Sequence, residues 1–191
     1  MSRDAHPARV FSHCPRCGKS PFPFDGRNAF NCPACSFRFY INEAASTAAI
    51  IERPASGSAR GLSHGAGPGS EILMIRRGRD PGAGTLDLPG GFVDIGETAE
   101  QAVRREVLEE LGVELAEARF MATFPNEYEY RGVLYFTLDI AFICRIKDEA
   151  ALTTSEEARE LLWMRARDVD ADAIGFPSIR NAVRRYAEMH A

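Results

Sequence analysis

The sequence of 191 residues lacks several features that would assign a chain to a class of proteins at once. No apolar run approaches the roughly 20 residues that a membrane-spanning helix requires, so a membrane protein is not expected. The first residues, Met1 to Pro7, lack the apolar core of a signal peptide, and we therefore predict a cytoplasmic protein. An excess of positive charge is also absent, since the formal net charge is −4, which argues against nucleic acid as a partner.

Cysteine is scarce, but four of the five cysteines are regularly spaced in the sequence. Cys14 and Cys17 form one CxxC pair, Cys32 and Cys35 form a second, and fourteen residues separate the pairs. Two CxxC turns that each direct two sulfurs at one point suit a tetrahedral Zn²⁺ ion. Disulfides are the alternative, although the absence of an export signal favours reduced thiols. Cys144 lies in an apolar run and is interpreted as a small buried hydrophobic residue.

Residues 1–43 are predicted to form a zinc ribbon, and residues 44–191 a second domain. So short a segment buries little apolar surface, and the metal would therefore contribute most of its folding energy. Six basic and three acidic residues give the ribbon a charge of +3 (6 − 3), and a zinc ion held by four thiolates brings this to about +1. The balance favours a structural role, while docking of a partner by the ribbon stays open.

The most informative stretch runs from Gly91 to Val113. A helix is predicted to begin at Thr98, because Gln101 three residues later completes a capping box. Gly112 is a suitable end, since glycine readily adopts the left-handed conformation that closes many helices. The helix therefore occupies most of this stretch.

Three carboxylates share one side of this predicted helix. At 3.6 residues per turn, Glu106, Glu109 and Glu110 fall within an arc of roughly 100°, which also carries apolar residues. Like charges at this spacing repel by about 0.2–0.5 kcal/mol per pair on an exposed helix, and by more where water is excluded. A hard divalent cation with oxygen ligands, Mg²⁺ or Mn²⁺, would relieve that repulsion. The alternative is a solvated acidic face, but such a face normally lies opposite the apolar one.

The same stretch resembles the complete signature of the Nudix hydrolases. It contains Gly91, then Glu97 after five residues, and then the run R-E-V-L-E-E-L-G-V from Arg105 to Val113 after seven more. So many filled positions over so short a stretch are a strong signal. The resemblance implies an α/β/α sandwich with a mixed sheet over residues 44–190. It also implies a Mg²⁺- or Mn²⁺-dependent enzyme that hydrolyses a diphosphate linkage.

The resemblance further implies which groups hold the metal. Glu106 and Glu110 are expected as direct ligands, and Glu109 as a ligand through a water or a second ion. The carbonyl of Gly90 is expected as an additional ligand, because glycine lets the backbone approach closely.

The remaining catalytic assignments concern orientation and the general base. Glu97 is expected to act on a second metal or behind the ligands, and Arg105 to fix a glutamate by charge-assisted hydrogen bonds. Family members differ in their base, so Glu106 stays open beside a downstream glutamate, Glu157 or Glu156. A helix cap or a surface charge is the simpler interpretation of that downstream pair.

The rest of the chain predicts the elements of the sandwich. Strands are expected at residues 44–52, 72–75, 120–124, 133–145 and 161–164, with a closing amphipathic helix at 177–190. A flexible glycine- and serine-rich loop is expected at 54–70, with His64 solvated in it, and a second loop at 125–132.

Substrate contacts are expected from two groups of residues. Arg76 and Arg77 would clamp phosphate, or else belong to a solvated charge run. Phe124, Tyr128 and Tyr130 would stack on a base, or else belong to the core.

A ribbon ahead of a Nudix box is similar to the layout of the NADH pyrophosphatases. Their serine-glutamine-proline-tryptophan motif is absent, however, and F-P-N-E-Y-E-Y stands in the matching region. The expected substrate is therefore a nucleotide-derived small molecule of the ADP-ribose, NADH or nucleotide-sugar type. A non-catalytic nucleotide sensor is the competing interpretation, although the intact carboxylates argue against it, and a homodimer stays open.

Overall fold

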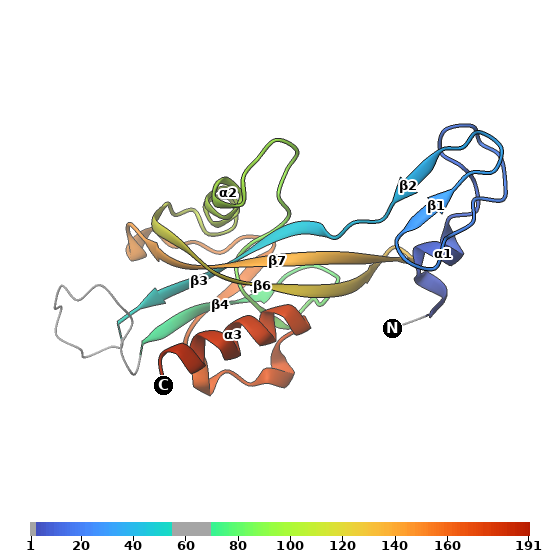
Figure 1. The fold of residues 1–191 in the computed structure, drawn as a ribbon. Coiled ribbons are helices and arrows are strands. Elements are labelled where there is room, and N and C mark those ends of the chain that lie inside the picture. Colours follow the sequence, from blue (N-terminus) through green and yellow to red (C-terminus); the bar gives the residue numbers. More distant parts are fainter. Residues whose placement is uncertain (1–2, 55–69) are drawn as a thin grey trace. The chain divides into compact units, whose positions relative to one another are not determined.

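The computed structural model describes residues 3–54 and 70–191 (Figure 1). Residues 1–2 and 55–69, which include most of the predicted flexible loop and His64, lie outside the described residues. The chain forms two compact units. The first combines Met1–Ala44 with Glu127–Thr137, and the second combines Ala45–Asn126 with Leu138–Ala191.

Short helical turns accompany three α-helices and eight strands in the described part of the chain. In chain order the elements are η1 (Arg3–Ala5), α1 (Pro7–Val10), β1 (Ala29–Asn31), β2 (Arg38–Tyr40), β3 (Ala44–Arg53), β4 (Glu71–Arg77), β5 (Leu86–Asp87), α2 (Ala99–Leu111), β6 (Leu115–Tyr130), β7 (Val133–Ile146), η2 (Glu149–Ala151), β8 (Ala158–Arg165), η3 (Ala166–Asp168), η4 (Ala171–Ala173) and α3 (Pro177–Met189). Within the described ranges, every helix is too short or too polar to span a bilayer.

The large sheet is mixed. Its strands follow the order β5-β4-β3-β7-β6, and β8 pairs with β4 in addition. β4 runs antiparallel to β3, β5 and β8. Between the neighbours β3 and β7, Ser46 bonds to Asp139 and Arg145 bonds to Glu52. Both contacts join residues 93 apart in the sequence, which is the constant offset of strands that run parallel.

The alternation of side chains along β3 creates a core on each face of the sheet. Ala48 and Ile50 belong to a buried cluster with α3, whereas Ala49 and Ile51 belong to a cluster with α2. Because successive strand residues point to opposite faces, the two helices must cover opposite faces. Figure 1 shows α2 and α3 on the two sides of the sheet. The predicted α/β/α sandwich with a mixed sheet is confirmed.

One boundary was predicted wrongly. The loop expected at 125–132 is for the most part strand, because β6 continues to Tyr130 and only Arg131 and Gly132 form the turn to β7. Asn126 is buried whereas its neighbours Pro125 and Glu127 are exposed. This alternation with a period of two sustains a strand, and it outweighs the loop tendency of proline.

The first unit is built around aromatic side chains and cysteines. β1 and β2 form a two-stranded antiparallel sheet. Phe22 stacks on Phe30 with ring centroids 5.1 Å apart, and Cys14 and Cys32 are buried in the same cluster. So small a core needs an additional source of stability. The clustered cysteines indicate that a bound metal ion could supply it.

Candidate active site

Helix α2 occupies most of the stretch from Gly91 to Val113, which is called the box below. It begins and ends where the sequence predicted. The Thr98 side chain accepts the Gln101 N–H, and the Gln101 side chain accepts the Thr98 N–H, so the capping box is complete. Gly112 closes the helix in the left-handed conformation, with φ of 71°. Val103, Val107 and other apolar residues of α2 pack on the sheet, which fixes the rotation of the helix about its axis. That rotation determines how deeply each glutamate side chain is buried.

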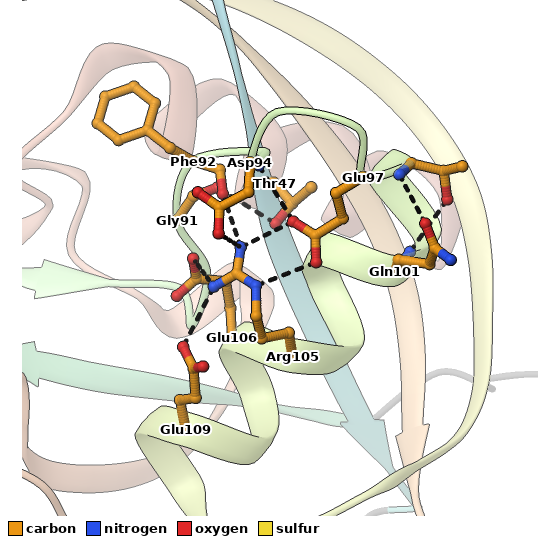
Figure 2. A network of polar contacts seen from close by, with 10 residues as sticks. Thr47, Gly91, Phe92, Asp94, Glu97, Gln101, Arg105, Glu106 and Glu109 are labelled. Atoms are coloured by element: carbon orange, nitrogen blue, oxygen red, sulfur yellow. Dashed lines mark hydrogen bonds and ion pairs between the residues drawn. The ribbon is translucent and has the colours of Figure 1, made fainter.

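Arg105 is the centre of a polar network above the helix (Figure 2). Its Nε and Nη2 atoms donate to the two carboxylate oxygens of Glu97, at 3.0 and 2.9 Å. Its Nη1 atom donates to Glu106 at 2.7 Å and to Glu109 at 3.1 Å, and Nη2 also donates to the carbonyl of Phe92 at 2.9 Å. One guanidinium therefore forms hydrogen bonds with three carboxylates, and its role in orienting them stays a prediction.

Glu110 is held by the backbone instead. Its side chain points into the protein, where Oε2 accepts the N–H of Gly90 at 3.1 Å, and the residue is 8% exposed. Among the ion pairs of the described residues, none includes Glu110. A buried carboxylate with a single backbone donor favours either a proton or a cation.

Two adjacent glycines let the loop approach the helix and the sheet. A Cβ on Gly91 would lie 2.5 Å from Oε1 of Glu106. A Cβ on Gly90, whose φ is 149°, would lie 2.0 Å from the carbonyl oxygen of Thr47. The N–H of Thr47 donates to the Gly91 carbonyl and that of Ala49 donates to the Pro89 carbonyl, so β3 holds the loop in place.

The electrostatics separate the glutamates. Burial raises the pKa of Glu110, the Gly90 N–H opposes this, and the charges of Glu106, Asp87 and Glu157 bring the pKa to about 8. Burial also raises the pKa of Glu106 against the effect of Arg105. The bonds from Arg105 instead hold the pKa of Glu97 below its usual value. Glu106 and Glu110 are therefore the glutamates that a nearby positive charge would stabilise most.

The glutamates of α2 offer oxygen donors that suit a divalent metal ion, but these donors do not converge on one point. The side chains of Glu106 and Glu109 are 14% and 60% exposed, and both contact Arg105. Among the described residues, the four cysteines are the one group of three or more potential ligands that already converge. Carboxylate oxygens are the ligands that Mg²⁺ and Mn²⁺ prefer, so the donor set fits such an ion after rotation of its side chains.

Glu157 acts electrostatically on the box. Its charge contributes to the raised pKa of Glu106 and of Glu110. Its carboxylate accepts from Nη1 of Arg79 at 2.7 Å, and Arg79 also contacts Glu156. The side chains of Arg79, Glu156 and Glu157 are each at least half exposed.

The two arginines expected to clamp phosphate have protein partners. Arg76 donates to Glu160 at 2.6 Å and to the Gly84 carbonyl at 3.0 Å. Arg77 donates to the Pro81 carbonyl at 2.9 Å and to Asp87 at 2.6 Å. Their role toward a substrate stays a prediction.

The three aromatic residues expected to stack on a base fall in different units. Phe124 packs against the core beneath α3 in the second unit. Tyr128 and Tyr130 belong to the first unit, where Tyr128 stacks on Tyr135 with centroids 5.7 Å apart and Tyr130 lies beneath Arg131. The structure therefore does not bring these three residues together as one stacking surface within a unit.

Sequence reasoning missed Asp87, a buried acid on β5. It is 5% exposed, and burial raises its pKa to about 6, while Arg77 lowers it. The signal was present: an acid stands in the otherwise apolar run Leu86-Asp87-Leu88 just before the two glycines. A charged residue in such a run requires a partner, which here is Arg77.

The four paired cysteines form a second candidate metal site, in the first unit. Their sulfur atoms all lie within 4.8 Å of one another, with Cys14 to Cys35 at 3.8 Å and Cys17 to Cys32 at 3.7 Å. Sulfurs at the corners of a tetrahedron around Zn²⁺, with Zn–S bonds of about 2.3 Å, are about 3.8 Å apart. The arrangement therefore fits a tetrahedral metal ion without rearrangement.

The sequence is similar to a known family and to proteins of known name. The family model described as "NUDIX domain" matches residues 65–186. The NAD-capped RNA hydrolase NudC of Deinococcus radiodurans is 32% identical over 133 residues, which are 70% of this chain and 43% of that protein. The protein of the same name from Escherichia coli O1:K1 is 27% identical over 161 residues, which are 84% of this chain and 54% of that protein. The chain thus spans about half the length of the curated relatives it matches.

Solved structures share the fold. A Nudix hydrolase from Nitrosomonas europaea superposes with a TM-score of 0.65 at 21% identity, over 93% of this chain and 91% of that one. A MutT Nudix hydrolase from Burkholderia pseudomallei superposes with a TM-score of 0.57 at 24% identity, over 75% and 98%. These likenesses agree with the sandwich described above.

Proposed function

The chain belongs to the Nudix hydrolase family, and from that premise we propose that it hydrolyses the diphosphate of a nucleoside diphosphate joined to another group. One observation carries the proposal. Glu106 and Glu110 project from α2 toward Gly90 and Gly91, at the point where both glycines bring the backbone closest to the carboxylates. A helix face that only solvated its charges would not bury a glutamate against a loop amide.

The proposed metal ligands are Glu106, Glu110 and the Gly90 carbonyl, with Glu109 as a ligand through a water or a second ion. Bound Mg²⁺ or Mn²⁺ would neutralise charge on the diphosphate oxygens and supply a nucleophilic water. The fit is supported by the raised pKa of Glu110, because a site that favours a proton in the metal-free chain also favours a cation. We assign Arg105 to holding Glu97 and Glu106 in fixed rotamers.

Two residues compete as general base. Glu106 lies in the box, and Glu157 lies on the segment whose charge affects the box glutamates. We propose to separate them by turnover of Glu106→Gln and Glu157→Gln at saturating Mg²⁺, with Glu156→Gln as the neighbouring comparison. A loss below tenfold, about 1.4 kcal/mol of transition-state stabilisation, removes that residue as the base.

We propose the substrate class on the basis of the family and the relatives. Their names include NAD-capped RNA, which contains a diphosphate between two nucleosides. ADP-ribose, NADH and nucleotide sugars share that diphosphate, and all of them belong in the test. The absence of a basic excess in the chain favours the small molecules over the capped RNA.

The decisive experiment is a substrate panel. The chain is incubated with Mg²⁺ and NADH, ADP-ribose, a nucleotide sugar, a diadenosine polyphosphate, an NTP and an NAD-capped oligoribonucleotide. Glu110→Gln serves as the matched inactive control, because glutamine keeps the acceptor for the Gly90 N–H. Release of a nucleoside monophosphate by the wild type alone supports the proposal. Tight nucleotide binding without turnover by either protein would instead indicate a non-catalytic sensor.

For the first unit we propose a structural Zn²⁺ bound by the two CxxC pairs. The sulfur separations support this ion, since tetrahedral thiolate sites favour zinc. We also propose that the protein acts in the cytoplasm, where free thiols of this kind persist.

A further inference from the structure

The buried Asp87 and the partly exposed Arg77 form an ion pair near the candidate metal site. Asp87 stands opposite Ile75 in the antiparallel pairing of β4 and β5. Residues directly opposite in such a pair share one face of the sheet. Ile75 packs against Val103 and Val107 of α2, so Asp87 lies on the face that α2 covers.

Both carboxylate oxygens of Asp87 are engaged. Oδ2 accepts from Nη1 of Arg77 at 2.6 Å, and Oδ1 accepts the N–H of Leu88 at 2.8 Å. Arg77 is fixed in turn, because its Nε donates to the Pro81 carbonyl and its guanidinium lies 5.0 Å from the ring centroid of Phe176. The pair therefore joins the end of β4 to the first amide of the segment that leads into the box.

That segment carries the two glycines of the site. Gly90, three residues after Asp87, donates its N–H to Glu110, and Gly91 lies against Glu106. Hydrogen bonds to Thr47 and Ala49 of β3 hold the middle of the segment. The bond from the Leu88 N–H to Asp87 holds its beginning.

We propose that Asp87 and Arg77 are positioning residues: their ion pair fixes the course of Leu88 to Gly91, and thereby keeps the Gly90 amide on Glu110 and the backbone beside Glu106. This assigns Arg77 an inward structural task in place of a phosphate clamp. The proposal deepens the function proposed above and rests on its divalent-metal site.

The test uses the full chain and two measurements that need no substrate. The first is Mn²⁺ affinity from electron paramagnetic resonance, and the second is hydrogen exchange of the Gly90 amide in the metal-free protein. Asp87→Asn keeps an acceptor for Leu88 but loses the ion pair, and Arg77→Met loses it from the other side. We expect each variant to weaken Mn²⁺ binding about tenfold and to speed exchange at Gly90 about tenfold. The double variant should lose no more than either single one, since both remove the same bond.

A matched control lies at the opposite end of β4. Glu71 pairs with Arg53 at 2.8 Å, and the Arg53 side chain is 25% exposed, the same fraction as that of Arg77. Glu71→Gln removes a comparable ion pair from the same strand, so it should leave Mn²⁺ affinity and Gly90 exchange unchanged. The Mn²⁺ affinity and the Gly90 exchange rate of Arg77→Lys should fall between those of the wild type and Arg77→Met. Lysine reaches Asp87 but cannot at the same time donate to the Pro81 carbonyl.

Several results would overturn the proposal. They are unchanged Mn²⁺ affinity and exchange in Asp87→Asn, an equal loss in Glu71→Gln, and additive losses in the double variant. Arg77→Lys keeps the positive charge, so it can still be measured if Asp87→Asn fails to fold. Wild-type Mn²⁺ affinity and Gly90 exchange in Arg77→Lys would then reject the positioning role. If the wild type itself binds no Mn²⁺, the proposed metal function fails, whereas exchange at Gly90 still decides the positioning role.

Discussion

The burial of Glu110 makes a quantitative prediction for the metal-free protein. The pKa of this carboxyl is about 8 in the folded chain, against an ordinary value of 4.5. The folded state therefore binds its proton about three and a half powers of ten more tightly than the unfolded state, which is about 5 kcal/mol. Because the folded pKa is raised, this contribution to stability is complete below pH 4.5. It is lost as the pH rises toward 8.

Replacing Glu110 by glutamine removes the charge and keeps an acceptor for the Gly90 N–H. In EDTA, the free energy of unfolding of Glu110→Gln should exceed that of the wild type by an amount that grows with pH. The difference should start near zero at pH 4.5, rise by about 1.4 kcal/mol per pH unit, and level off above pH 8. Urea denaturation at intervals between pH 5 and pH 9 measures it.

The control is Glu109→Gln, on the same helix but with a carboxylate that is 60% exposed. This substitution removes one helix charge without relieving burial, so it should not reproduce the rise. Adding Mg²⁺ at a hundred times the wild-type Kd should narrow the difference at pH 8 by about 2.7 kcal/mol, because the ion stabilises the wild type and the glutamine variant lacks the carboxylate that binds it. Parallel stability curves for wild type and Glu110→Gln in EDTA would refute the account of this site.

Three further predictions concern other parts of the chain. Arg105→Met should lower kcat at least tenfold in a steady-state assay, because Glu97 and Glu106 lose the guanidinium that orients them; a loss below threefold would contradict that role. Gly91→Ala should lower kcat by a similar factor while shifting the melting temperature by only a few degrees, because the added Cβ displaces the Glu106 carboxylate rather than the core. Cys35→Ser should reduce zinc from about one ion per chain to about none by mass spectrometry, and full zinc retention would reject the four-thiolate site.

Local sequence signals predicted the box helix because its determinants lie within a few residues of one another. Thr98 and Gln101 are three apart, and Gly112 follows the last helical residue, so each cap is decided by its own neighbourhood. The cysteines were predictable for a similar reason, since two CxxC turns repeat one local geometry. Cys32 and Cys14 each accept the N–H of the residue four positions later.

The depth of the individual glutamates was not predictable in this way. Helical spacing places Glu106, Glu109 and Glu110 on one arc, yet the structure buries Glu110 and exposes most of Glu109. The difference comes from the loop around Gly90, whose position depends on hydrogen bonds to β3, forty or more residues earlier in the chain. Periodicity within one helix carries no information about such a neighbour.

The burial of Asp87 and the length of β6 were not predicted from the sequence for related reasons. The partner of Asp87 is ten residues away, across a hairpin whose geometry the sequence does not state. β6 passes through Pro125 as strand because alternate burial on either side of the proline outweighs its local tendency.

β3 has a consequence for how the protein can change. Its consecutive residues Ala48, Ala49, Ile50 and Ile51 pack alternately into the two cores, and its backbone also holds the loop around Gly90. Deleting a single residue here would exchange the side chains presented to the two helices and move every anchoring amide by one position. Mutational drift along this strand is thus confined to replacements of similar size.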